Sequence, residues 1–177
     1  TDEQGRHLGL IHRDLSAQNV LLSLAGGVKI ADFGLAKAKD RLSVTTSELP
    51  TRALAHVAPE ELRQQPTDHR SDLFSFGVML FELLTGRLPF ADTSPLRLML
   101  EVVNAQIPDV QELNGAVDAE AAAILAKMVA KDPAERFQHA GEVADALGRH
   151  PLVAAGVPLR LVVRPPDPDT LAANALQ

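Results

Sequence analysis

Two short apolar runs near the start of the chain have the composition of β-strands. Residues 20–24 (Val-Leu-Leu-Ser-Leu) and residues 28–31 (Val-Lys-Ile-Ala) carry mainly branched apolar side chains, and Gly26 and Gly27 lie between them. Paired glycines between such runs are typical of a tight turn, because glycine adopts positive φ without steric cost. The pattern therefore predicts an antiparallel β-hairpin.

A longer apolar stretch follows at residues 73–84, where Phe, Val, Met and Leu side chains occupy nearly every side of a helix. A helix that is apolar all round is buried at the centre of its domain, because no face is left for water. Gly86 and Pro89 come directly after the stretch and are typical helix-ending residues. We therefore expect a buried central helix that ends before Gly86.

Three further amphipathic segments predict helices that cover this centre. Ser94 and Pro95 suit an N-cap and first helical position, and Arg97 and Glu101 are spaced to pair on the outer face. Asp118 is positioned to cap an alanine-rich helix, and Gly148 to end the last one. The residues expected to face the core are Leu96, Met99, Val102, Val103, Ile124, Leu125, Met128, Val129, Ala140, Val143, Ala144 and Leu147.

Composition fits one folded domain over residues 1–150, followed by a Pro-rich linker or tail over residues 151–177. The chain has 177 residues, 46% of them apolar, which is enough for one substantial core. It has no Cys, so disulfides and thiolate metal sites are excluded, and no apolar run long enough for a membrane span. The net charge of −6 and the lack of Tyr and Trp argue against nucleic-acid binding. We expect a cytoplasmic protein.

Chemistry-bearing residues concentrate around the predicted hairpin. His12-Arg13-Asp14 precedes the first strand, Asn19 ends that loop, and Asp32 follows the second strand. Two acids and an amide on neighbouring loops can face one cleft, and their oxygens suit a hard cation such as Mg²⁺. A plainer interpretation also stands, in which Asp14 caps backbone amides while Asn19 and Asp32 are turn residues.

Three more motifs follow in order: Ala58-Pro59-Glu60, residues 71–77 (Ser-Asp-Leu-Phe-Ser-Phe-Gly) and residues 132–136 (Asp-Pro-Ala-Glu-Arg). Together with His-Arg-Asp and Asp-Phe-Gly, they resemble the large, C-terminal lobe of eukaryotic-type (bacterial Hanks-type) Ser/Thr protein kinases. The resemblance implies an α+β, mainly α fold with short β-hairpins around the catalytic and magnesium loops. No motif of the small N-terminal lobe is present, so we expect that lobe upstream in a longer parent.

The resemblance also implies a role for each motif residue. Asp14 would accept the proton of a protein hydroxyl, Asn19 and Asp32 would bind Mg²⁺, and Leu21 would form the floor under the adenine of ATP. Outside this site, the resemblance implies that Glu60 pairs with Arg136 and that His12 stacks with Phe33. It also implies that Asp72 accepts backbone hydrogen bonds from the catalytic loop, although Asp72 could instead be a helix N-cap. The implied function is transfer of the γ-phosphoryl group of MgATP to Ser or Thr of a protein substrate.

The sequence departs from the family pattern near the catalytic Asp. Ser16 stands where most Ser/Thr kinases have Lys, Arg52 and Ala53 replace a Gly-Thr pair, and His56 occupies a position that is commonly aromatic. A Ser supplies no positive charge to the transferring phosphoryl group. The alternatives are therefore a catalytically inactive pseudokinase scaffold and, third, a kinase-like small-molecule phosphotransferase. We favour an active variant, because all the metal-binding and catalytic residues are intact.

Two expectations concern activity and its regulation. The 177-residue chain alone is expected to be nearly inactive, because it lacks a Gly-rich phosphate-covering loop and the strand Lys. In the parent, phosphorylation between Gly34 and Pro59, with Thr45 and Thr46 as preferred sites, is expected to raise activity by adding negative charge near Arg13.

Overall fold

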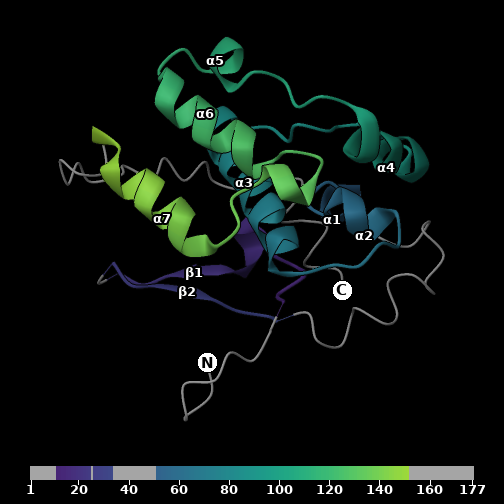
Figure 1. Ribbon diagram of the computed structural model, residues 1–177, viewed down its shortest axis with the longest axis horizontal. Helices are drawn as coiled ribbons and strands as arrows, with labels where there is room; N and C mark the ends of the chain where they lie inside the picture. The colour runs from purple at the N-terminus through teal and green to yellow at the C-terminus, as the bar shows by residue number, and fades with distance from the viewer. Residues whose placement is uncertain (1–10, 25, 34–50, 152–177) are drawn as a thin grey trace, which may run out of the picture.

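The computed structural model describes residues 11–24, 26–33 and 51–151, which form a helical body with one small hairpin at its edge (Figure 1). Thr45, Thr46 and residues 152–177 of the predicted tail lie outside these ranges. The elements, in chain order, are η1 (Ala17–Asn19), β1 (Val20–Leu22), β2 (Val28–Ile30), α1 (Thr51–Leu54), α2 (Pro59–Leu62), α3 (His69–Thr85), α4 (Pro95–Asn104), α5 (Val110–Leu113), α6 (Ala119–Met128), η2 (Pro133–Glu135) and α7 (Ala140–Arg149). In the described ranges, no helix is both long and apolar enough to cross a membrane.

The predicted hairpin is confirmed. Strands β1 and β2 pair antiparallel, with Leu21 opposite Lys29, and Gly26 turns the chain with a φ of 83°. Each strand is shorter than its apolar run, because the pairing extends only from Val20 opposite Ile30 to Leu22 opposite Val28. Most of the apolar side chains of the hairpin remain exposed, and those of Leu21 and Val28 are 54% and 64% exposed.

Helix α3 is the central element, as the sequence predicts, and the other helices pack around it (Figure 1). The side chains of Phe74, Val78 and Phe81 are completely buried. The helix ends at Gly86, whose φ of 74° is the left-handed conformation of a glycine C-cap. One detail is wrong: Leu83 is 58% exposed, so the helix is not buried on every side.

At the start of α3, the structure excludes the possible role of Asp72 as the N-cap. The N-cap is Asp68, whose carboxylate accepts a hydrogen bond of 2.8 Å from the backbone N–H of Arg70. Asp72 lies one turn later, inside the helix, and its side chain is used elsewhere. The helix begins earlier than its apolar run, because polar residues also form its first turn.

Helix α4 begins at Pro95 as predicted, and the expected core positions Val102 and Met99 do pack against the core, but Leu96 does not. Leu98 and Val102 are the buried positions, whereas Leu96 is 63% exposed. Positions 98 and 102 are four apart and share the face that packs against α1 and α2, which decides the orientation of the helix. Ser94 occupies the N-cap position without a side-chain hydrogen bond, and the described ion pairs do not include the predicted pair of Arg97 and Glu101.

Helices α6 and α7 complete the core. The Asp118 carboxylate accepts a 2.9 Å hydrogen bond from the N–H of Ala121, which confirms the predicted cap. The four predicted core positions of α6 are buried: Ile124, Leu125, Met128 and Val129. In α7 only Val143 is buried, and Gly148 does not end the helix, which continues to Arg149.

Gly77 sets the distance between α3 and the end of α6. An added Cβ would lie 2.5 Å from Cγ1 of Val129 and 3.0 Å from Cβ of Met128. We expect Gly77→Ala to lower the free energy of unfolding by about 1–3 kcal/mol, because both contacts are in a packed core. Urea denaturation measures this. The matched control is Gly148→Ala, where a Cβ meets nothing within 4 Å, and we expect it to raise stability by up to about 1 kcal/mol. Equal effects of the two changes would contradict this packing.

Candidate active site

The loop that carries Asp14 is held to helix α3 by one side chain. The carboxylate of Asp72 accepts hydrogen bonds of 2.8 Å from the backbone N–H groups of both His12 and Arg13. Arg13 has a φ of 62°, a conformation that L-residues rarely adopt. Such backbone persists only where its surroundings hold it, and the two bonds to Asp72 do so. The role that the resemblance gives to Asp72 is therefore confirmed.

His12 connects this loop to the end of the hairpin. Its Nε2 lies 2.9 Å from the carbonyl oxygen of Ala31, and its Nδ1 lies 3.2 Å from the backbone nitrogen of Asp14. A carbonyl only accepts and an N–H only donates, so the ring carries its hydrogen on Nε2. The ring also packs against Phe33, with centroids 4.7 Å apart, as the resemblance implies. His12 is thus a structural bridge and not a proton carrier.

Asn19 and Asp32 are brought together by the hairpin. The backbone N–H of Ala31 donates a 2.8 Å hydrogen bond to the carbonyl of Asn19, which places the next residue, Asp32, beside the end of the catalytic loop. The Asn19 amide nitrogen donates a 2.7 Å bond to the carbonyl of Asp14. Asp32 has a φ of 57° and an exposed side chain. Asn19 is therefore bonded to Asp14 through its side chain and to the residue before Asp32 through its backbone carbonyl, which fixes the three positions relative to one another.

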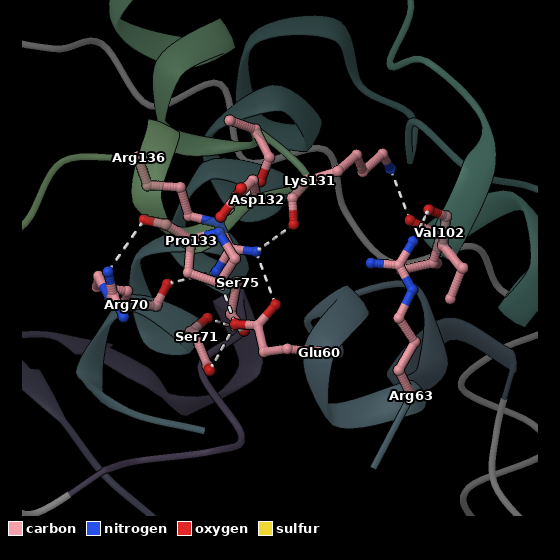
Figure 2. A network of polar contacts seen from close by, with 12 residues as sticks. Glu60, Arg63, Arg70, Ser71, Ser75, Val102, Lys131, Asp132, Pro133 and Arg136 are labelled. Carbon is pink, nitrogen blue, oxygen red and sulfur yellow. Dashed lines mark hydrogen bonds and ion pairs between the residues drawn. The ribbon is translucent and has the colours of Figure 1, made fainter. Parts of the chain in front are cut away.

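Behind this site, Glu60 and Arg136 form the buried ion pair that the resemblance implies (Figure 2). Two parallel hydrogen bonds of 2.7 Å join the guanidinium to both carboxylate oxygens, and the Arg136 side chain is fully buried. Burial raises the pKa of Glu60, but the hydrogen bonds and charge of Arg136, helped by the Ser71 hydroxyl, outweigh it and lower the pKa overall. Glu60 is therefore held as the carboxylate.

Two cations that sequence reasoning missed lie at the end of helix α4. The Lys131 ammonium donates to the carbonyl of Val102 at 2.6 Å (Figure 2), and the Arg63 guanidinium donates to that of Val103 at 3.0 Å. The last carbonyls of a helix lack intrahelical partners and carry partial negative charge, so cations stabilise them. Burial, followed by the charges of Arg136 and Arg63, lowers the pKa of Lys131 to about 8. The sequence around Lys131 gives no sign of this contact, because Lys131 and α4 are not related by any fixed spacing.

Except for Ser16, the residues that depart from the family pattern lie on and just after α1. Arg52 forms an ion pair with Glu82 of α3, and His56 is buried beside the same carboxylate. Ala53 is half-buried, and Ser16 precedes η1 without a side-chain capping bond. In place of a Gly-Thr pair, the chain therefore builds a charged contact to the central helix.

A cavity of about 620 Å³ lies elsewhere, between the segment before α5 and helix α6. Its walls include Ile107, Val110, Ala122 and Lys131, and none of the predicted site residues. The chemistry-bearing residues instead line an open edge, where Leu21 is 54% exposed. Among the described residues, no group of three or more His, Cys, Asp and Glu side chains is placed to bind a metal by itself.

Comparison with known proteins agrees with this geometry. The sequence matches the protein kinase domain family over residues 6–153. It is 37% identical to the tyrosine-protein kinase MasK of Myxococcus xanthus over 83% of this chain and 23% of that protein. It is 36% identical to the serine/threonine-protein kinase PknL of Mycobacterium tuberculosis over 75% of this chain and 33% of the relative. The chain therefore belongs to the protein kinase family, of the Hanks type.

A further relative is the serine/threonine-protein kinase PrkC of Bacillus subtilis, 32% identical over 76% of this chain and 21% of that protein. The chain thus spans between about a fifth and a third of the length of these curated relatives. The mainly helical fold with its small two-stranded sheet is consistent with a kinase-like fold.

The buried pair of Glu60 and Arg136 gives a direct test. We expect either Glu60→Ala or Arg136→Ala to lower the free energy of unfolding by about 3–5 kcal/mol, because each change strands the partner's charge away from water. The double substitution is expected to cost less than the sum of the two single changes. A double-mutant cycle in urea measures the coupling, and simple additivity would show that the pair does not act as a unit.

Glu61, next in the chain, makes stability depend on pH. Burial raises the pKa of its carboxyl from 4.5 to about 7, and the neighbouring Glu60 charge adds to the rise. Because the folded protein holds this proton more tightly than the unfolded chain, its stabilising contribution is complete below pH 4.5 and lost as the pH rises through 7. We expect Glu61→Gln to flatten this fall and to add about 1–3 kcal/mol of stability at pH 8. The control is Glu112→Gln on an exposed carboxylate, and an identical pH profile in both variants would contradict the prediction.

Proposed function

We propose that this chain is the large lobe of a protein kinase and that its parent transfers the γ-phosphoryl group of MgATP to a hydroxyl of a protein substrate. The observation that carries the proposal is the attachment of the catalytic loop to α3. Asp72 holds the backbone of His12 and Arg13, and Asn19 holds the carbonyl of Asp14. These bonds fix Asp14 between two elements of the core, as a positioned proton acceptor requires.

The donor set near the hairpin fits a magnesium-bound nucleotide. Asn19 uses its amide nitrogen to bind the Asp14 carbonyl, which leaves its amide oxygen for a hard cation. Asp32 supplies an exposed carboxylate at the adjoining position. We assign Asn19 and Asp32 as Mg²⁺ ligands, Leu21 as a contact for the adenine of ATP, and Asp14 as the base. When bound, Mg²⁺ would neutralise negative charge on the phosphates.

The exposed hairpin supports the proposal that the parent supplies a small lobe. Leu22, Val28 and Ile30 are 56%, 64% and 50% exposed, and Phe33 is 50% exposed. An isolated two-stranded hairpin is at best marginally stable in water and gains stability when a further layer covers it. Neighbouring apolar side chains on one short hairpin also mark a surface that another part of a protein covers. A small lobe seated there would complete the nucleotide site next to Leu21.

Although Ser16 replaces the usual Lys, we favour an active variant of the enzyme over an inactive one. The Asp14, Asn19 and Asp32 arrangement is complete, whereas a scaffold without catalysis has no need of it. A kinase-like small-molecule phosphotransferase ranks third, because such enzymes typically lack the Asp-Phe-Gly and Ala-Pro-Glu motifs that this sequence contains. The acceptor amino acid is a separate question, because the relatives include kinases named for tyrosine and for serine/threonine. We favour Ser or Thr, since the tyrosine-kinase motifs are absent from the sequence.

The parent protein allows a test of the catalytic assignment. We expect Asp14→Asn to lower phosphoryl transfer to a protein substrate about 10²–10⁴-fold, because an amide cannot accept the hydroxyl proton. Asp32→Asn is expected to reduce transfer and to raise the Mg²⁺ concentration needed for half-maximal rate. Radiolabelled ATP followed by phosphoamino-acid analysis measures both the rate and the acceptor. The control is Asp145→Asn on the exposed face of α7.

Full activity of Asp14→Asn would overturn the proposed base, and an inactive parent would favour the pseudokinase. Label on tyrosine alone would replace the Ser/Thr assignment. The 177-residue chain by itself is expected to show little or no transfer in the same assay, and robust turnover would show that no small lobe is needed.

A further inference from the structure

The side chain of His56 is buried with one ring nitrogen left unbonded. The residue is 7% exposed, and Nε2 has no hydrogen-bond partner. The other nitrogen, Nδ1, lies 3.1 Å from the carbonyl oxygen of Arg52. A carbonyl oxygen only accepts, so Nδ1 carries the hydrogen and Nε2 of the neutral ring is an unprotonated acceptor. A buried acceptor without a donor is costly and calls for a physical explanation.

The atom that faces this nitrogen is also an acceptor. Oε2 of Glu82, on α3, lies 3.7 Å from Nε2, and the Glu82 side chain is only 14% exposed. Its other oxygen, Oε1, is bound by the guanidinium of Arg52, whose side chain is 58% exposed. Two acceptors cannot hydrogen-bond to each other, so His56 and Glu82 are apposed without a bond. A single proton on Nε2 would convert this contact into an ion pair.

Three charged groups act on the imidazole, each from a different element. Burial lowers the pKa of His56 most strongly, and the Arg52 guanidinium on α1 lowers it further. The Arg52 carbonyl, the Glu82 carboxylate on α3 and the Asp14 carboxylate of the catalytic loop raise it, but the net pKa lies below the usual 6.5. The ring is therefore neutral at pH 7, and Arg52 has the Glu82 carboxylate to itself.

We propose that His56, Glu82 and Arg52 form a proton-operated latch. On acidification, Nε2 of His56 takes a proton from solvent and donates it in a hydrogen bond to Oε2 of Glu82. The carboxylate is then shared between two cations, which weakens its hold on the exposed Arg52 side chain. The latch changes the charge and contacts of the segment that leads into Ala58-Pro59-Glu60, and it does not depend on the proposed phosphoryl transfer.

The backbone at His56 restricts which part of the latch moves. The hydroxyl of Ser75 donates a 2.7 Å hydrogen bond to the carbonyl of His56, and this hydroxyl is buried on α3. His56 and Glu82 are thus both fixed to the central helix. Arg52 is the exposed member, so the release of its guanidinium is the movement that we expect.

Nuclear magnetic resonance of the isotope-labelled 177-residue chain tests the latch without nucleotide or substrate. Between pH 8 and 5, we expect the Arg52 Nε–H signal to change with the same midpoint as the ring signals of His56. Glu82→Gln is expected to lower the His56 midpoint by about one pH unit or more, because the stabilising carboxylate is gone. Arg52→Gln, a change at an exposed site, is expected to raise the midpoint.

The ring signal of the exposed His139 is the internal reference and should respond to neither substitution. A His56 ring that stays neutral until the protein unfolds would overturn the latch. So would an Arg52 signal that does not follow His56, or midpoints that are unaltered in both variants. Because no ATP is present, none of these results depends on whether the parent is a kinase.

Discussion

The charged guanidinium of Arg136 is completely enclosed within the protein. Both oxygens of Glu60 bind it at 2.7 Å, and its remaining hydrogens reach the carbonyls of Arg70, Ala130 and Lys131. A buried charge of this kind is tolerated only when every donor is used, because each lost partner leaves an uncompensated charge in a low-dielectric interior. Helix α2, the start of α3 and the segment around η2 are therefore fixed relative to one another.

Helix α3 transmits that rigidity to the catalytic loop. Arg136 binds the carbonyl of Arg70 in the first turn of α3, and Asp72 in the same turn binds the backbone of His12 and Arg13. The loop itself contains few buried side chains and a residue with positive φ, so it has little stability of its own. Its conformation is therefore fixed by its contacts with the core. This arrangement places a rigid helix behind the loop that carries Asp14, the proposed proton acceptor.

The same helix also receives the residues by which this chain departs from its family. Glu82, near the C-terminal end of α3, binds Arg52 and faces His56, so the segment before Ala58-Pro59-Glu60 is tied to the core by charge. The Ser75 hydroxyl adds a bond to the His56 carbonyl. A segment that lacks the usual Gly-Thr pair is thus held by a different set of contacts. The physical consequence is sensitivity to protonation, which an aromatic side chain at position 56 would not have.

The sequence by itself predicted the hairpin and the main helices, and it supplied the residues of the proposed site. Fixed spacing marked Asp14, Asn19 and Asp32, a helix-wide apolar run marked α3, and paired glycines marked the hairpin, because these signals are local in the chain. It left the role of Asp72 open and missed the burial of Leu98 on α4, since both depend on segments distant in sequence. Only the tertiary structure decided that Lys131 and Arg63 meet the end of α4, and that His56 faces Glu82. Such contacts join residues with no fixed spacing, so burial and charge become defined only once the helices pack.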